Sequence, residues 1–163
     1  RVIDELSNVY GNDRVGIKLS PGGGYNDMGM NEKDTSETFG YLIKELSKRK
    51  IAYIQLARYW DLGDPVKRGT PVDIFQWSNL IDRKHTALFV NTNYNAEEGA
   101  KVLESGLADA VVFGRSYISN PDLAERLAKK QELNSALNFM TLYGGSAAGY
   151  TDYPTYEQQK QQA

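Results

Sequence analysis

The sequence predicts an α/β domain built around a parallel sheet, and three observations favour this class. Four short apolar runs, rich in β-branched residues and bounded by turn residues, have the character of buried strands. Amphipathic segments with helical spacing follow these runs, so that strand and helix alternate four times. The 163 residues, of which 40% are hydrophobic and 25% charged, have the composition of an ordinary globular domain.

The four expected strands cover residues 15–20 (VGIKLS), 52–57 (AYIQLA), 87–91 (ALFVN) and 110–114 (AVVFG). Because a helical segment follows each of them, we expect the strands to lie parallel, with the helices covering the sheet.

The first expected helix covers residues 36–49, where apolar side chains recur at helical spacing. Asp34 with Glu37 resembles a capping box in front of this helix. A second helix is expected over residues 73–82 (DIFQWSNLID), where the same pattern returns.

Two later segments carry helix start signals. Residues 95–107 (NAEEGAKVLESGL) have Asn95 in the position of an N-cap and Glu98 at the third helical position. Residues 120–130 (NPDLAERLAKK) begin with Asn120 as a cap and Pro121 at the first helical position, where its missing N–H costs nothing.

Charge and residue usage exclude several function classes. The net charge of −2, without a basic stripe or a basic amphipathic helix, argues against nucleic acid and membranes as partners. With no Cys and a single His, the chain cannot build a disulfide, a Cys/His zinc site or a thiol nucleophile, and no metal is expected. No apolar stretch approaches the roughly 20 residues of a membrane span and there is no apolar leader, so a cytoplasmic location is expected.

Gly114 and Arg115 stand at the end of the fourth apolar run. Free N–H groups after a strand, a residue without a side chain and a permanently charged guanidinium together suit a phosphate group. The alternative is that Gly114 is a turn residue and Arg115 a surface cation, or an ion-pair partner of Asp109 or Asp122.

The preceding strand ends in Asn91, Thr92 and Asn93, which offer backbone and side-chain donors to the same place. In (β/α)₈ barrels the phosphate site commonly lies in the loops after the seventh and eighth strands. A full barrel needs about 250 residues, so four strands predict either an open sheet or half of a barrel.

Three stretches are similar to the carboxyl-terminal half of the old yellow enzyme family, FMN-dependent ene-reductases built on a (β/α)₈ barrel. They read RVGIKLSPGG, DAVVFGRSYISNPDLAERL and YGGSAAGYTDYPTY, and the similarity spans residues 14–156 in the family's order and spacing. The resemblance implies that the four strands are strands five to eight. Residues 1–163 would then be the second half of one FMN-binding domain, with four βα units over 14–130 and a carboxyl-terminal cover segment over 131–163.

The resemblance also implies a set of cofactor contacts. Gly114 and Arg115 fall on the positions that hold the FMN phosphate, and residues 91–93 fall on its other backbone cradle. Lys18 stands where the family usually has Arg, near the pyrimidine edge of the flavin. Strand alternation turns Lys18 away from its apolar neighbours and into the barrel, with an exposed strand lysine as the alternative.

Other positions bear on the substrate and on the flavin edge. Tyr25 matches a position that often holds an aromatic residue over the substrate, and packing on the barrel rim is the alternative. Tyr143 is expected along the dimethylbenzene edge of the flavin, or else as cover for the barrel mouth. Arg58, Tyr59 and Trp60 stand where the family commonly has an acidic residue and a Pro or Thr, which leaves the substrate scope open.

The resemblance implies an activity and a partner. FMN, reduced by NADPH or NADH, would reduce the C=C bond of an α,β-unsaturated carbonyl compound. The residues that bind the substrate carbonyl and protonate the substrate lie in the first half of the barrel in this family, so we assign no catalytic residue here. A complementary amino-terminal half-barrel is expected as partner. An FMN-dependent redox-neutral isomerase or cyclase, and a non-catalytic half-barrel scaffold, stay open as alternatives.

Overall fold

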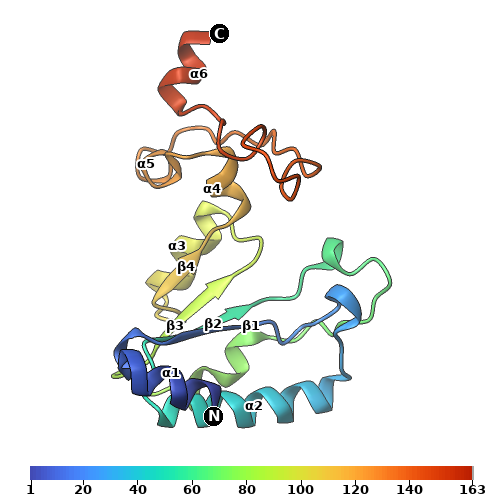
Figure 1. Cartoon of the computed structure of the whole chain (residues 1–163), viewed down its shortest axis with the longest axis vertical. Helices are drawn as coiled ribbons and strands as arrows, with labels where there is room; N and C mark the ends of the chain where they lie inside the picture. The colour runs from blue at the N-terminus through green and yellow to red at the C-terminus, as the bar shows by residue number, and fades with distance from the viewer. Residues whose placement is uncertain (163) are drawn as a thin grey trace. The chain divides into compact units, whose positions relative to one another are not determined.

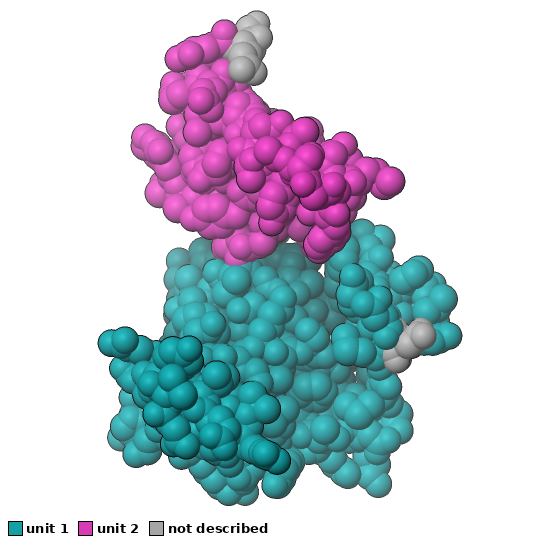
Figure 2. All heavy atoms as spheres, in the orientation of Figure 1, with its two compact units in different colours: residues 1–112 teal, residues 113–163 magenta. Residues whose placement is uncertain are grey.

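The computed structural model describes residues 1–162. The chain forms two compact units, Arg1–Val112 and Phe113–Ala163, which Figure 2 shows in different colours. The first unit holds the sheet and its crossover helices, and the second holds the short helices and turns of the remaining chain.

The first unit is a four-stranded parallel sheet in the order β1-β2-β3-β4 (Figure 1). The strands are β1 (Gly16–Leu19), β2 (Tyr53–Ala57), β3 (Ala87–Asn91) and β4 (Ala110–Val112). The helices are α1 (Val2–Tyr10), α2 (Glu32–Lys48) and α3 (Ala96–Glu104), with the 3-10 helices η1 (Asn12–Arg14), η2 (Tyr25–Asp27), η3 (Asp61–Gly63) and η4 (Ile74–Leu80). Neighbouring strands are consecutive in the chain, so the predicted α/β class with a parallel sheet is confirmed.

The core of this unit lies on one face of the sheet. The side chains of Ile54, Leu56, Leu88 and Val90 are completely buried, and Figure 1 shows α1 and α2 together on one side of the strands. The intervening positions of the same strands, among them Tyr53 and Phe89, are only half-buried. Because successive side chains of a strand point to opposite faces, the second face of the sheet is open.

Aromatic rings from two strands stack on this open face. The ring centres of Tyr53 and Phe89 lie 4.6 Å apart, with their planes inclined by 8°. Gly16 of β1 leaves room for Tyr53, because a Cβ at Gly16 would stand 2.3 Å from the tyrosine ring. The two rings form an apolar patch on the open face, next to Gln55 and Lys18 of the same face. Exposed apolar patches of this kind can mark interaction surfaces in soluble proteins.

Two helices of the first unit differ from the prediction. α2 is capped by Asn31, whose Oδ1 accepts from the N–H of Asp34 at 2.9 Å. The expected capping box of Asp34 and Glu37 is therefore wrong, because Asp34 is already the third helical residue. The segment expected as a helix over 73–82 is the 3-10 helix η4, and its N-cap Asp73 accepts from the N–H of Phe75 at 2.9 Å.

The second unit contains α4 (Arg115–Ser119), α5 (Leu123–Ala128) and α6 (Tyr156–Gln162). The expected cap at Asn120 is wrong: α5 begins after Asp122. The buried side chain of Asn120 instead donates to the carbonyl of Ser116 at 2.9 Å and accepts from the N–H of Asn134 at 2.7 Å. The expected strand over 110–114 ends two residues early, since Gly114 already caps α4.

None of the helices in residues 1–162 combines the length and the apolar character that crossing a membrane requires.

Candidate functional site

A cavity of about 220 Å³ opens at the carboxyl ends of β1, β2 and β3. Lys18 on β1 and Thr92 after β3 line it, and the loops after β1 and β2 contribute Tyr25, Arg58 and Tyr59 among others. Three residues singled out from the sequence, Lys18, Tyr25 and Thr92, therefore come together here. This edge of a parallel sheet is where α/β proteins place their binding sites.

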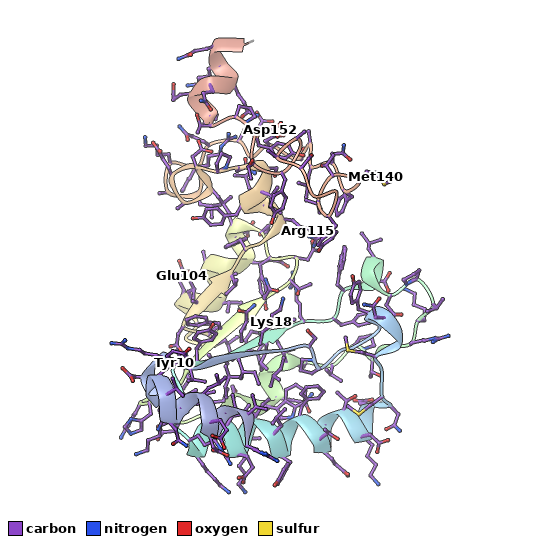
Figure 3. All side chains as sticks on the ribbon, in the orientation of Figure 1. Tyr10, Lys18, Glu104, Arg115, Met140 and Asp152 are labelled. Carbon is purple, nitrogen blue, oxygen red and sulfur yellow. The ribbon has the colours of Figure 1, made fainter. Side chains whose placement is uncertain are left out.

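Lys18 lies on the open face of the sheet. Its side chain is exposed, whereas Ile17 and Leu19 are partly buried. Figure 3 shows Lys18 on the side of the sheet that faces away from α2. The alternation predicted for this strand is confirmed, and it makes the ammonium group accessible to a ligand above the open face.

The loops that follow β1 and β2 form the wall of the cavity around one buried carboxylate. Asp64 is completely buried and accepts hydrogen bonds from the N–H groups of Arg68 (2.9 Å) and Gly69 (2.8 Å) and from the Tyr59 hydroxyl (2.9 Å). Burial by itself raises the pKa of Asp64, but these hydrogen bonds outweigh it and hold the pKa below its ordinary value. Burial and the Asp64 carboxylate raise the pKa of Tyr59, which keeps its hydroxyl protonated as a donor.

The glycine-rich loop after β1 packs against this carboxylate. Gly24 has a φ of +86°, and a Cβ there would stand 2.5 Å from the Asp64 Cγ. The N–H of Thr70 donates to the carbonyl of Gly22 at 2.7 Å, which fastens one loop to the other. Tyr25, 58% exposed, is thereby presented at the cavity from a loop that is fixed on both sides.

The turn after β3 has an uncommon backbone conformation. Thr92 and Asn93 have φ values of +85° and +55°, a region that costs a non-glycine residue roughly 1–3 kcal/mol. Asn91 directs its side-chain amide to β4, donating to the carbonyl of Val112 at 2.6 Å. The turn predicted to cradle a phosphate is thus a strained segment that its surroundings must hold in place.

Arg58 is the residue that holds it. The backbone N–H of Arg58 donates to the carbonyl of Asn91 at 3.1 Å, Nε donates to that of Thr92 at 2.8 Å, and Nη2 donates to that of Asn93. From the sequence, Arg58 was only a departure from the family pattern. Its contact with a turn 34 residues away depends on the pairing of β2 with β3 and has no local sequence signal.

The guanidinium of Arg58 is itself fixed. It lies 4.0 Å from the ring centre of Tyr94 and donates to a Glu98 oxygen at 3.1 Å. Glu98 belongs to the capping box of α3, where it also accepts from the N–H of Asn95. The hydrogen bond from Arg58, followed by that from Asn95, holds the pKa of Glu98 below its usual range.

Three further predicted residues lie in the second unit. Gly114 is the N-cap of α4, and apart from its chain neighbours and the backbone of its own helix no described atom lies within 4 Å of the point where its Cβ would be, so the backbone is open on that side. The guanidinium carbon of Arg115 lies 6.0 Å from the ring centre of Phe139. Tyr143 is 94% exposed.

The two carboxylates considered as alternative partners of Arg115 each bind another arginine. Asp109 forms an ion pair with Arg83. Asp122 accepts from Nε of the buried Arg126 at 2.8 Å.

The donors of the site are compatible with a phosphate-bearing flavin. In the first unit, Lys18 brings an exposed cation to the cavity. In the second unit, no side chain of the described residues covers the backbone of Gly114. The cavity is smaller than the roughly 300–1,000 Å³ of pockets for ligands of drug size, so its size is that of one part of a larger binding site. Residues 1–162 contain no cluster of His, Asp or Glu side chains that could hold a metal ion.

Comparison with known proteins identifies the family. The model of the "NADH:flavin oxidoreductase / NADH oxidase family" matches residues 1–134. The "Probable flavin mononucleotide-dependent alkene reductase" of Leishmania infantum is 34% identical over 153 residues, 94% of this chain and 39% of that protein. "Enoate reductase 1" of Kluyveromyces lactis is 34% identical over 173 residues, 96% of this chain and 41% of that protein. The structure of the old yellow enzyme from Trypanosoma cruzi aligns with a TM-score of 0.81 and 32% identity, over 95% of this chain and 38% of that one.

The chain spans about two fifths of the length of these relatives. The family match begins before α1 and extends past α5, so it includes the whole parallel sheet and the start of the second unit. The chain therefore belongs to the NADH:flavin oxidoreductase / NADH oxidase family, the family of the old yellow enzymes.

Proposed function

We propose that this chain forms strands five to eight of an FMN-binding (β/α)₈ barrel. The whole protein would reduce the C=C bond of α,β-unsaturated carbonyl compounds with NADPH or NADH as electron donor. The observation that carries the proposal is the cavity at the carboxyl ends of β1 to β3, with Lys18 and Tyr25 in its lining. The family match and the coverage of about two fifths of each relative support the assignment to half of a barrel.

The phosphate of FMN is assigned to two sets of residues. Asn91, Thr92 and Asn93 would supply backbone N–H donors, and Gly114 and Arg115 would supply an open backbone and a guanidinium. Guanidinium and backbone N–H groups are the donors that suit phosphate oxygens best, because the hydrogen bonds are charge-assisted.

Three side chains are assigned to the ring system and the substrate. When bound, FMN would supply the hydride-transfer chemistry that no side chain of this chain can perform. Lys18 would hold its ammonium group near the pyrimidine edge of the flavin and favour negative charge there. Tyr25 would cover the substrate, and Tyr143 would lie along the dimethylbenzene edge.

The remaining parts of the site are assigned to a complementary half-barrel. The open face of the sheet, with the stacked rings of Tyr53 and Phe89, would be covered by strands one to four. That half would carry the groups that bind the substrate carbonyl and donate a proton to the substrate, so no catalytic residue is proposed here.

The first experiment asks whether the protein is a flavoenzyme. We expect the assembled, purified protein to be yellow and to consume NADPH when a simple enone is added. Bound flavin without NADPH consumption on any enone would favour a redox-neutral isomerase or cyclase. Absence of flavin binding would favour a non-catalytic scaffold and overturn the proposal.

The second experiment tests the phosphate assignment. Arg115→Ala should weaken FMN binding by roughly 1.5–3 kcal/mol, the range of a hydrogen bond to a charged group. Binding of riboflavin, which lacks the phosphate, should hardly change. An equal loss for the two ligands, measured by quenching of flavin fluorescence, would mean that Arg115 acts through folding.

A further inference from the structure

Three consecutive carbonyl groups, at the end of β3 and in the turn after it, are bound by one residue. The carbonyls of Asn91, Thr92 and Asn93 accept, in that order, from the backbone N–H, Nε and Nη2 of Arg58. The guanidinium reaches the second and third of these carbonyls because its donors lie in one plane with a fixed angle between them. An ammonium group, which is a single point of charge, cannot span two carbonyls and a carboxylate in the same way.

These hydrogen bonds determine which way the N–H groups of the turn point. In a trans peptide the C=O and the N–H of the same unit point in opposite directions, and the bonds after Thr92 and Asn93 are trans. With both carbonyls facing Arg58, the N–H groups of Asn93 and Tyr94 are directed away from it. The positive φ values of Thr92 and Asn93 are the cost of this arrangement.

Arg58 is also held by groups outside the turn. Its guanidinium lies against the buried ring of Tyr94 and pairs with Glu98 at the start of α3. The side chain is 31% exposed, so most of it is packed between these groups. β2, the turn and α3 are therefore joined through one side chain.

We propose that Arg58 is a positioning residue that orients the N–H groups of the turn for an anionic ligand. The inference rests on the proposed FMN phosphate site. Without Arg58, Thr92 and Asn93 would relax toward ordinary φ values, and their carbonyl oxygens would no longer be held away from the phosphate. The role of Arg58 is thus to keep negative partial charges out of the phosphate site and to keep donors in it.

The test compares FMN with riboflavin in the flavin-containing protein. Arg58→Met keeps the length of the stem and removes the donors, so Kd for FMN should rise about ten- to hundredfold while Kd for riboflavin stays nearly constant. Arg58→Lys should lose nearly as much as Arg58→Met, because an ammonium cannot hold both carbonyls. Amide hydrogen exchange of residues 92–94 should become faster in both variants.

Three outcomes separate the possible failures. If Arg58→Lys restores FMN binding, Arg58 acts as a charge on the ligand itself and the positioning role is wrong. If Arg115→Ala lowers the preference for FMN over riboflavin and the Arg58 variants do not, the proposed phosphate site is supported and the positioning role of Arg58 is wrong. If the unaltered protein binds FMN and riboflavin equally well, the proposed phosphate site itself is wrong.

Arg49→Met is the matched control. Arg49 is 35% exposed, close to the 31% of Arg58, and it forms ion pairs with Asp4 and Glu45. It follows α2 and is not part of the cavity lining. Thermal unfolding of all the variants shows whether a loss of FMN binding reflects a loss of the fold, and Arg49→Met should leave the preference for FMN intact.

Discussion

Lys18 illustrates how one strand position decides which face of the sheet carries a charge. A strand places successive side chains on opposite faces, so the charge at position 18 falls on the open face while its neighbours pack into the core. The family resemblance assigns a cation to this place, and Lys keeps the charge but lacks the fork of an arginine. The consequence is a specific expectation for the electrochemistry of the flavin.

Lys18→Met should lower the midpoint potential of the bound flavin by some tens of millivolts. The substitution removes a charge at similar length, and the anionic reduced ring loses more stabilisation than the neutral oxidised ring. For a two-electron couple about 1.4 kcal/mol corresponds to about 30 mV. Lys18→Arg should keep the potential or raise it slightly. Redox titration against a reference dye measures all three proteins, and an unchanged potential in Lys18→Met with flavin still bound would place Lys18 away from the ring.

Asp64 is the residue on which the cavity wall depends. One carboxylate oxygen accepts from the N–H of Arg68, and the other accepts from the N–H of Gly69 and the hydroxyl of Tyr59. Asp64→Asn would turn an NH₂ group toward one of these sets of donors. We expect the variant to unfold at a lower temperature and the two loops to exchange their amide hydrogens faster.

The same residue has a defined dependence on pH. Because the folded-state pKa of Asp64 lies below its unfolded value, its contribution to stability is present above about pH 4 and is lost as the pH falls through the folded-state value. The difference in Tm between the unaltered protein and Asp64→Asn should therefore be constant near neutral pH and shrink in acid. Asp61→Asn, at an exposed carboxylate of the same loop region, is the control and should change Tm little.

At the scale of elements, the sequence predicted the strands well because their signal is local. Residues 87–91 form β3 with the predicted bounds, and β1 and β2 differ by one residue at their ends. α3 also begins at its predicted cap, with both halves of the capping box formed. The predicted starts of α2 and α5 were wrong. In α2 a different polar side chain, Asn31, caps the first turn. At α5 the expected cap, Asn120, forms its hydrogen bonds elsewhere.

The candidate site was only partly predictable for a related reason. The sequence indicated Lys18, Tyr25 and Thr92 separately, and the sheet brings them to one cavity. The roles of Arg58 and Asp64 depend on contacts between loops that follow different strands, so no pattern within a single segment reveals them. The positive φ of a threonine is likewise imposed by the tertiary structure, since its β-branched side chain disfavours that conformation.

α3 offers a test of how an element and the site are coupled. Asn95→Ala removes the cap and should lower the free energy of unfolding by about 1 kcal/mol. Glu98→Gln keeps an oxygen that can accept from the N–H of Asn95 but removes the charge that faces Arg58. We expect Glu98→Gln to destabilise the protein less than Asn95→Ala in urea unfolding, yet to weaken FMN binding more. The reverse order in FMN binding would mean that Arg58 needs no anionic anchor.

For the chain as a whole, the open face of the sheet is the feature on which the proposed half-barrel partner rests. The helices of the first unit bury Ile54, Leu56, Leu88 and Val90 completely, and the opposite face keeps its stacked aromatic pair half-buried. β1 and β4 are the edges of the sheet, and an edge strand presents unpaired backbone groups to other chains. A complementary half-barrel would cover the face and pair with both edges at once.

This requirement predicts how the isolated 163-residue chain behaves. Alone it should self-associate, because the apolar rings of Tyr53 and Phe89 and both sheet edges are available. Mixing with the complementary half should give one monodisperse species that retains FMN. Phe89→Lys should make the isolated chain more soluble and at the same time prevent assembly with that half. Tyr41→Lys is the control, since Tyr41 is 71% exposed on α2, and it should change neither property. Sedimentation velocity measures both outcomes, and a compact, stable monomer of about 18 kDa formed by the unaltered chain would contradict the half-barrel. If Phe89→Lys assembled normally, the open face would not be the surface that meets the second half.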